Sequence, residues 1–137
     1  MFQVLRVADR NFGIAKFNLQ SSLASNDDVV GMELLFAAAL DPEIKELYLS
    51  GGLLSFQDVV DSEQHNQAFA NFVPGLLNHT DLPEVAASVA PREIVLAGTV
   101  NASGKTLPVE TVRKVYSSAN ITLEPAPAWS AARLLAL

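Results

Sequence analysis

The stretch IVLAGTVNASGKT, residues 94 to 106, predicts a buried strand followed by a loop that contains glycine. Its first three residues form an apolar run, which is typical of a strand covered on both faces of a parallel sheet. The loop ends in Gly104-Lys105-Thr106, the three residue types that close a phosphate-binding loop. This strand and its loop therefore raise the question of whether the protein binds a nucleotide.

The spacing of the loop argues against a nucleotide site. A phosphate-binding loop has four residues between its glycines, so that successive backbone amides curl around the phosphate. Here five residues separate Gly98 from Gly104, and the next helix is delayed to Pro108. The apolar run at residues 47–49 ends in Ser50, where an aspartate would be needed to hold magnesium. The sequence therefore favours an ordinary turn after a strand.

Short apolar runs alternate with helical patterns on both sides of this strand. Thr80 or Asp81 caps one helix, which Pro91 ends. Alternating strands and helices indicate an α/β domain of three layers, with about four parallel strands and helices on both faces. The strands are predicted at residues 14–19, 47–49, 92–96 and 121–123, and the other helices at residues 3–12, 29–40, 55–62, 64–72, 108–117 and 129–137.

The length, composition and net charge of the chain narrow the class of protein. The 137 residues, half of them apolar, predict a single domain over residues 1–137. Nine Lys and Arg against fifteen Asp and Glu give a net charge of -6, which argues against nucleic acid as a partner. The chain has no cysteine, which excludes disulfides, thiolate catalysis and Cys-ligated zinc. No apolar run approaches the length of a membrane span, so we expect a cytoplasmic protein without cofactors.

Four strings follow one another in order from residue 37 onward. They are AAALDP (37–42), LYLSGGLLSF (47–56), FVPGLLNHTDLPEVAASVAPR (72–92) and, after a strand, VNASG (100–104). Together they resemble the C-terminal half of bacterial α/β-hydrolases of the acetyl-xylan-esterase-like kind. The resemblance implies a doubly wound sheet in which the four strands lie in chain order. It also implies a Ser-His-Asp triad at the carboxyl edge of that sheet.

The positions that match this triad hold other residues. The family's nucleophile lies in a G-x-S-x-G elbow before AAALDP, but the string LQSSLASNDDVVG places no glycines on both sides of Ser22 or Ser25. Asn101 stands where the acid is expected, and an amide cannot stabilise an imidazolium as a carboxylate does. The histidine is expected near residues 125–128, yet none follows His79. The resemblance therefore implies a truncated domain without the triad, with these four residues as weak catalytic candidates.

Two further groups of residues have alternative interpretations. His65 and His79, with three carboxylates near them in sequence, suggest a metal site, but their spacing matches no dense ligand motif. We therefore expect both histidines in loop packing or on the surface. Gly51 and Gly52 follow a predicted strand and could approach a ligand closely, but a tight strand exit is the interpretation that the sequence favours.

Two functions remain open from the sequence. The strand at residues 14–19 lacks the central neighbour that the resemblance implies, so we expect an exposed sheet edge that a homodimer covers. The first function is a non-catalytic, oligomeric binding or interaction module whose ligand is unknown. The alternative is a carboxylic-ester hydrolase, in which Ser22 or Ser25 is the nucleophile and His65 or His79 comes from a partner subunit.

Overall fold

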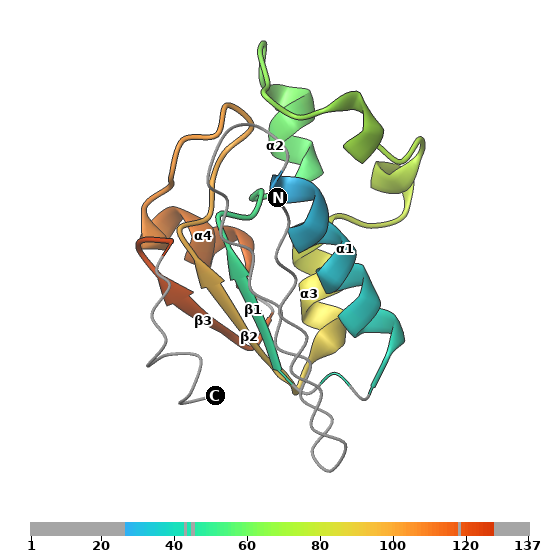
Figure 1. Cartoon of the computed structure of the whole chain (residues 1–137), viewed down its shortest axis with the longest axis vertical. Helices are drawn as coiled ribbons and strands as arrows, with labels where there is room; N and C mark the ends of the chain where they lie inside the picture. The colour runs from blue at the N-terminus through green and yellow to red at the C-terminus, as the bar shows by residue number, and fades with distance from the viewer. Residues whose placement is uncertain (1–26, 43, 45, 118, 128–137) are drawn as a thin grey trace.

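A computed structural model describes residues 27–42, 44, 46–117 and 119–127 of the chain (Figure 1). The predicted helices at residues 3–12 and 129–137 and the predicted strand at residues 14–19 lie outside the described residues. The same is true of the two candidate nucleophiles, Ser22 and Ser25.

Three parallel strands form the described sheet. They are β1 (Glu46–Ser50), β2 (Glu93–Ala97) and β3 (Ile121–Glu124), in the spatial order β1-β2-β3. The register aligns Leu49 with Leu96, and Leu96 in turn with Leu123. The three predicted strands within the described part of the chain are therefore confirmed, in direction and in order.

Four helices connect or precede these strands. They are α1 (Asp27–Leu40), α2 (Phe56–Asp61), α3 (Leu82–Val89) and α4 (Val109–Val115). The cap of α3 is Asp81, and Pro108 stands directly before α4, so local signals set both starts. None of the described helices is long and apolar enough to cross a membrane.

The helix predicted at residues 64–72 is wrong. That segment contains only the single turn η1 (Phe69–Asn71), and a second such turn, η2 (Leu76–Asn78), follows it. Asn66 shows one physical reason. Its amide donates to the carbonyl oxygen of Ala102 (2.9 Å) and its side chain to that of Ser103 (2.6 Å). These hydrogen bonds to a distant loop take the place of a local helical pattern.

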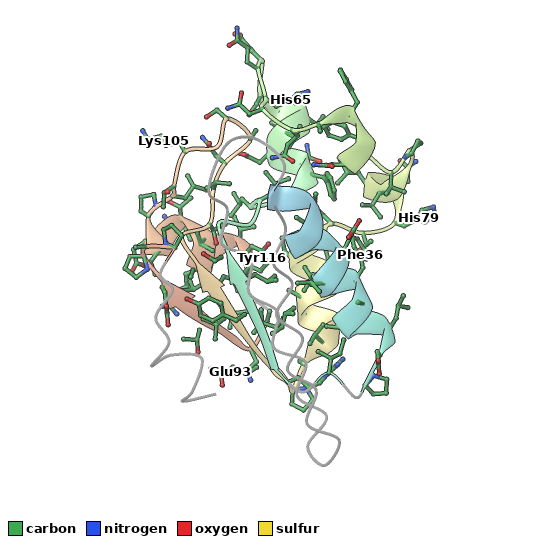
Figure 2. The ribbon with its side chains drawn as sticks, in the orientation of Figure 1. Phe36, His65, His79, Glu93, Lys105 and Tyr116 are labelled. Atoms are coloured by element: carbon green, nitrogen blue, oxygen red, sulfur yellow. The ribbon has the colours of Figure 1, made fainter. Side chains whose placement is uncertain are left out.

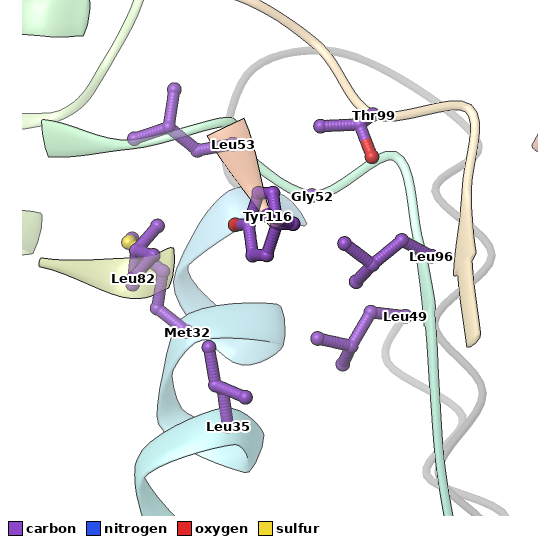
Figure 3. Close-up of a pocket in the computed structure, with 9 residues that line it drawn as sticks. All are labelled: Met32, Leu35, Leu49, Gly52, Leu53, Leu82, Leu96, Thr99 and Tyr116. Carbon is purple, nitrogen blue, oxygen red and sulfur yellow. The ribbon is translucent and has the colours of Figure 1, made fainter. Parts of the chain in front are cut away.

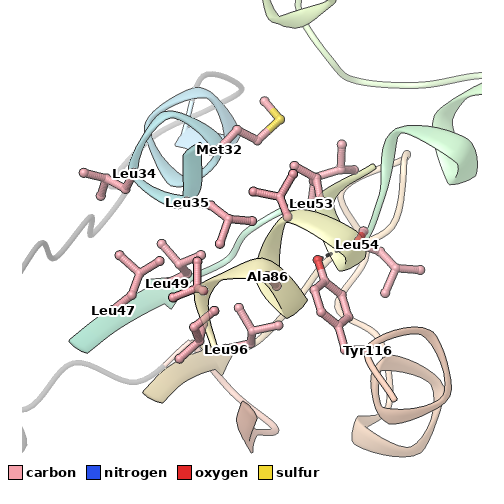
Figure 4. Close-up of a cluster of buried hydrophobic side chains, with 14 of the residues drawn as sticks. Met32, Leu34, Leu35, Leu47, Leu49, Leu53, Leu54, Ala86, Leu96 and Tyr116 are labelled. Atoms are coloured by element: carbon pink, nitrogen blue, oxygen red, sulfur yellow. Dashed lines mark hydrogen bonds between the residues drawn. The ribbon is translucent and has the colours of Figure 1, made fainter. Parts of the chain in front are cut away.

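The helices and one face of the sheet share one apolar cluster. Alternate residues of β1 and β2 enter this cluster (Figure 4). The residues that alternate with them form a separate buried group on the opposite face. Figure 1 shows α1 and α3 side by side along the sheet, as their contacts require. The described helices thus contribute to one layer, and a helical layer on the second face remains a prediction. The second group consists of Tyr48, Val95 and Ala97.

Arg92 holds the ends of two helices together. Its Nε donates to the carbonyl oxygen of Val89 at the end of α3 (3.1 Å). One of its terminal nitrogens donates to the carbonyl oxygens of Asp41 (2.9 Å) and Ile44 (2.8 Å), in the segment after α1. The last carbonyl groups of a helix have no partner within the helix, so a guanidinium is well suited to this position.

Candidate functional site

The loops that follow β1 and β2 stay hydrogen-bonded to each other beyond the strand ends. The Gly51 amide donates to the carbonyl oxygen of Ala97 (2.8 Å) and the Val100 amide to that of Gly52 (2.9 Å). The Leu54 amide then donates to the carbonyl oxygen of Val100 (2.9 Å). Ligands of open α/β sheets bind where neighbouring loops separate. Because these loops remain paired, the crevice between β1 and β2 is closed.

Hydrogen bonds within the protein occupy the amides of the loop after β2. The Asn101 amide donates to the carbonyl oxygen of Lys105 (3.0 Å), and the Gly104 amide donates to that of Asn101 (2.8 Å). The Ala102 amide donates to Oδ2 of Asp58 on α2 (2.6 Å). Gly104 has a φ of 81°, which a residue with a side chain rarely adopts. The amides of Asn101, Ala102 and Gly104 are therefore engaged within the protein.

Asn101 organises this turn through its side chain. Its Oδ1 accepts hydrogen bonds from the Lys105 amide (2.8 Å) and from the Ser103 hydroxyl (2.9 Å). Short polar side chains commonly close turns in this way. Asn101 thus has a structural use in this turn.

The two histidines of the chain lie on the segment between α2 and α3. The half-buried ring of His65 meets the rings of Phe69 and Phe72 edge-on, at centroid distances of 6.2 and 5.3 Å. Its Nδ1 is buried and has no hydrogen-bond partner. His79 is exposed, and its amide closes η2 by donating to the carbonyl oxygen of Leu76 (2.9 Å). These are the packing and surface positions that the sequence favours.

The described residues do not form a metal centre or a serine-histidine pair. No group of three or more His, Asp and Glu residues in this part of the chain could hold a metal ion. The hydroxyls of Ser62, Ser88 and Ser103 donate to carbonyl or amide oxygens, and that of Ser55 accepts from a backbone amide. None of these serine contacts involves His65 or His79.

The carboxylate of Asp81 joins the N-terminal ends of two helices. It is 8% exposed, and its Oδ1 accepts from the amides of Phe56 (2.8 Å) and Leu82 (2.7 Å). Its Oδ2 accepts from the Gln57 amide (3.0 Å), and the Asp81 amide donates to Glu84 (2.8 Å) in a capping box. The first amides of a helix have no partner within the helix, and their dipoles favour a negative charge. Asp81 therefore fixes α2 against α3.

Tyr116, the residue after α4, lies beneath these helix ends. Its hydroxyl donates to the carbonyl oxygen of Leu54 at 2.8 Å (Figure 4). Burial raises the pKa of this phenol well above its usual value near 10, and the neighbouring Asp81 carboxylate raises it further. The neutral phenol is thus a structural hydrogen-bond donor, and it does not supply a phenolate at neutral pH.

Replacing the Tyr116 hydroxyl is expected to weaken the fold in a pH-dependent way. Tyr116→Phe leaves the Leu54 carbonyl unpaired, which costs about 1 to 2 kcal/mol of unfolding free energy at pH 7. The native protein binds the phenol proton more tightly than the unfolded chain does, so the Tyr116 contribution is complete below pH 10 and falls as pH rises above it. Urea unfolding should therefore show a difference between wild type and variant that shrinks above pH 10. A constant difference would contradict this assignment.

A small cavity lies between α1, α3, the carboxyl ends of β1 and β2, and Tyr116 (Figure 3). Its volume of about 20 Å³ is room for roughly one water molecule. Sites for small ligands usually exceed roughly 300 Å³. The cavity is therefore a packing gap in the core. Its lining, which is almost entirely apolar, consists of Met32, Leu35, Leu49, Gly52, Leu53, Leu82, Leu96, Thr99 and Tyr116.

An exposed apolar surface lies on the segment between α2 and α3. We call it the 69–77 surface and define it by Phe69, Val73 and Leu77, which are 87%, 60% and 39% exposed. His65 and His79 mark the two ends of this segment in Figure 2. The predicted helix at residues 64–72 gives no sign of this surface, because its exposure depends on how the segment packs. A usable signal exists, since residues 64–80 contain no Asp, Glu, Lys or Arg.

Comparison with known proteins finds no matching family model, no matching curated protein and no matching solved structure. The fold and the site therefore define the class by themselves. The described part is an α/β domain with a three-stranded parallel sheet. At its carboxyl edge, hydrogen bonds between loops and helix ends engage Asn101, Asp81 and Tyr116.

Proposed function

We propose that this chain is a non-catalytic α/β domain, similar to the C-terminal half of an α/β-hydrolase, that acts as an oligomeric interaction module in the cytoplasm. The observation that carries the proposal is the use of the polar groups at the carboxyl edge of the sheet. Asn101 closes a turn, Asp81 caps two helices, and Tyr116 donates to a backbone carbonyl.

Ester hydrolysis would need polar groups at this edge that are free to contact the catalytic histidine and the substrate. A triad requires a carboxylate that orients an imidazole, and an oxyanion hole requires amides that point at the substrate. In the loop after β2, the Asn101 side chain is an amide, and the backbone amides of Ala102, Gly104 and Lys105 donate to acceptors within the protein. The water-sized cavity beside this edge adds no room for an acyl group. These features support a structural use of the edge.

The exposed surfaces support a role in association. Exposed apolar groups that lie together on a soluble domain commonly mark a contact with another molecule. The 69–77 surface offers three exposed apolar side chains on one segment, with Phe69 as its largest member. The open sheet edge predicted from the sequence would provide a second route to a dimer, since unpaired strands pair readily with another chain. In both routes the domain acts by binding.

An ester-hydrolysis assay distinguishes this proposal from the alternative of a carboxylic-ester hydrolase. With short p-nitrophenyl esters, we expect wild type, Ser22→Ala and Ser25→Ala to hydrolyse at the same rate as buffer. Asn101→Asp introduces the carboxylate that the resemblance implies at this position and keeps the Oδ1 acceptor of both hydrogen bonds, so it should fold normally. We expect it to remain inactive, because the remaining triad positions are not restored.

The alternative makes the opposite prediction for the same variants. If Ser22 or Ser25 is a nucleophile activated by His65 or His79 of a second subunit, wild type turns over and the matching serine variant does not. Loss of turnover in His65→Ala or His79→Ala would then identify the base. Turnover that depends on any of these residues would overturn the proposed function.

A further inference from the structure

We propose that residues 128–137 cover the second face of the sheet within the same chain. We call this face the 48–97 face and define it by its three buried residues, Tyr48, Val95 and Ala97. They are 6%, 3% and 0% exposed. A sheet face becomes buried in this way when another element packs against it. The inference goes beyond the proposed function, because it assigns an interaction surface within one chain.

The described helices do not supply this cover. The buried residues of α1, α2, α3 and α4 all belong to the apolar cluster on the opposite face. Figure 4 shows Leu35 of α1, Ala86 of α3 and Tyr116 after α4 in that cluster. Most of the cover of the 48–97 face must therefore come from outside the described residues, where the two long segments are 1–26 and 128–137.

The end of the described chain leads to the carboxyl edge of the 48–97 face. Glu124 on β3 is in register with Ala97, and its Oε2 accepts a hydrogen bond from the Tyr48 hydroxyl (3.2 Å). The chain then returns from β3 to the end of β2, because Pro127 lies directly against Gly98. The segment that follows therefore begins beside this face.

Residues 1–26 enter the fold from the other side of the sheet. They lead into α1, which contacts β1 and α3 and has its buried residues in the opposite cluster. The resemblance to α/β-hydrolases places their predicted strand, residues 14–19, beside β1 at the edge of the sheet. The path of the chain therefore favours residues 128–137 as the cover of the 48–97 face.

The composition and length of this segment fit the face. Its sequence is AWSAARLLAL, in which Ser130 and Arg133 are the only polar residues. On the helix that the sequence predicts, these two lie three positions apart and share one side, and Leu135 lies on the opposite side. Ten helical residues span about 15 Å and a five-residue strand spans about 17 Å, so the segment can run along the whole face.

The charges of the segment and of the face are complementary. The charged side chains of this face that the structure describes are the carboxylates of Glu93 and Glu124, which accept from the hydroxyls of Thr122 and Tyr48. Arg133 is the one charged side chain of residues 128–137. Opposite charges at the rim of a contact favour its correct orientation.

Nuclear Overhauser effects in the whole chain test the contact without any substitution. We expect cross-peaks from the side chain of Leu135 to the side chains of Tyr48 and Val95. We expect none from Leu135 to Val85, which lies in the opposite cluster. A mixture of isotope-labelled and unlabelled chains determines whether the contact lies within one chain.

Trp129, the only tryptophan of the chain, gives a second measurement. In wild type, we expect its fluorescence emission at a shorter wavelength than in the urea-unfolded chain. Leu135→Asp should move the emission to the wavelength of the unfolded chain, because a buried carboxylate without a partner is costly. Leu40→Asp adds the same charge at the end of α1, where Leu40 is 86% exposed, and should leave the emission unchanged. Circular dichroism checks that both variants are folded.

Each outcome supports or overturns the inference. Cross-peaks to Tyr48 and Val95 from residues 1–26, with none from Leu135, would overturn it and leave the proposed function in place. Cross-peaks from Leu135 that join only different chains would also overturn it, and they would support the oligomeric part of the proposed function. Equal emission in wild type and Leu135→Asp would contradict the contact. If Leu135→Asp fails to fold, the Overhauser measurement on wild type still decides.

Discussion

Asp81→Ala is expected to destabilise the domain by about 3 to 5 kcal/mol, because it removes one helix cap and leaves two further amides without an acceptor. The carboxylate accepts from the amides of Phe56, Gln57 and Leu82, and the first two belong to a different helix from the third. Loss of these bonds should free α2 from α3. Chemical denaturation followed by circular dichroism measures the effect.

Two control variants separate this role from a general loss of charge. Asp81→Asn keeps one acceptor oxygen and should cost about half as much as the alanine variant. Asp61→Ala removes a carboxylate that accepts an exposed hydrogen bond from the side chain of Gln57, and it should change stability by less than about 0.5 kcal/mol. If Asp81→Ala lowers the free energy of unfolding no more than Asp61→Ala does, the hydrogen bonds of the Asp81 carboxylate to the two helices do not stabilise the fold.

Gly98→Ala is expected to have the second large effect, of about 2 to 5 kcal/mol, since backbone strain and steric overlap act together. Gly98 has a φ of 59°, and a Cβ at this position would overlap Cδ and N of Pro127. The Gly98 amide also donates to the carbonyl oxygen of Glu124 (2.9 Å). This hydrogen bond holds the end of β3, and with it the segment that contains Pro127, beside the end of β2. Thermal or urea unfolding measures the loss.

Gly51→Ala is the matched control for this prediction. Gly51 has a similar φ of 70°, but a Cβ there would have no heavy atom within 4 Å. The control should therefore cost only the strain of the left-handed conformation, about 1 to 2 kcal/mol. The difference between the two variants isolates the overlap with Pro127. Equal losses would mean that the segment containing Pro127 moves away from Gly98 at little cost.

Most of the described elements could be predicted because their signals are local. The apolar runs at residues 47–49, 92–96 and 121–123 are all strands, and the predicted order is observed. Helix starts followed caps and prolines, as Asp81 and Pro108 show. In each case the deciding residues lie within one or two turns of the element that they define.

The helix predicted at residues 64–72 failed because a distant contact decided that segment. The amide and side chain of Asn66 bind the loop after β2, and Gln67 and Asn71 are both buried polar residues within the segment. Composition alone does not reveal which polar groups a distant loop will bind. The same limit hid the 69–77 surface, whose exposure depends on how the segment packs.

The candidate site divides in the same way. The sequence favoured packing or surface positions for His65 and His79, and these are the positions that the two residues occupy. It did not show that Oδ1 of Asn101 closes a turn, or that the Asp81 carboxylate serves two helices. Those uses depend on acceptors and donors that only the folded chain brings together.

The amino-acid sequence by itself determined the strands and the ends of most described helices, because apolar runs, caps and prolines act on neighbouring residues. Only the tertiary structure decided what the polar residues of the edge do. The Asp81 carboxylate meets an amide 25 positions away, and the Asp58 carboxylate meets one 44 positions away. A buried amide must find an acceptor wherever the fold supplies one, so its partner is a property of the packed chain.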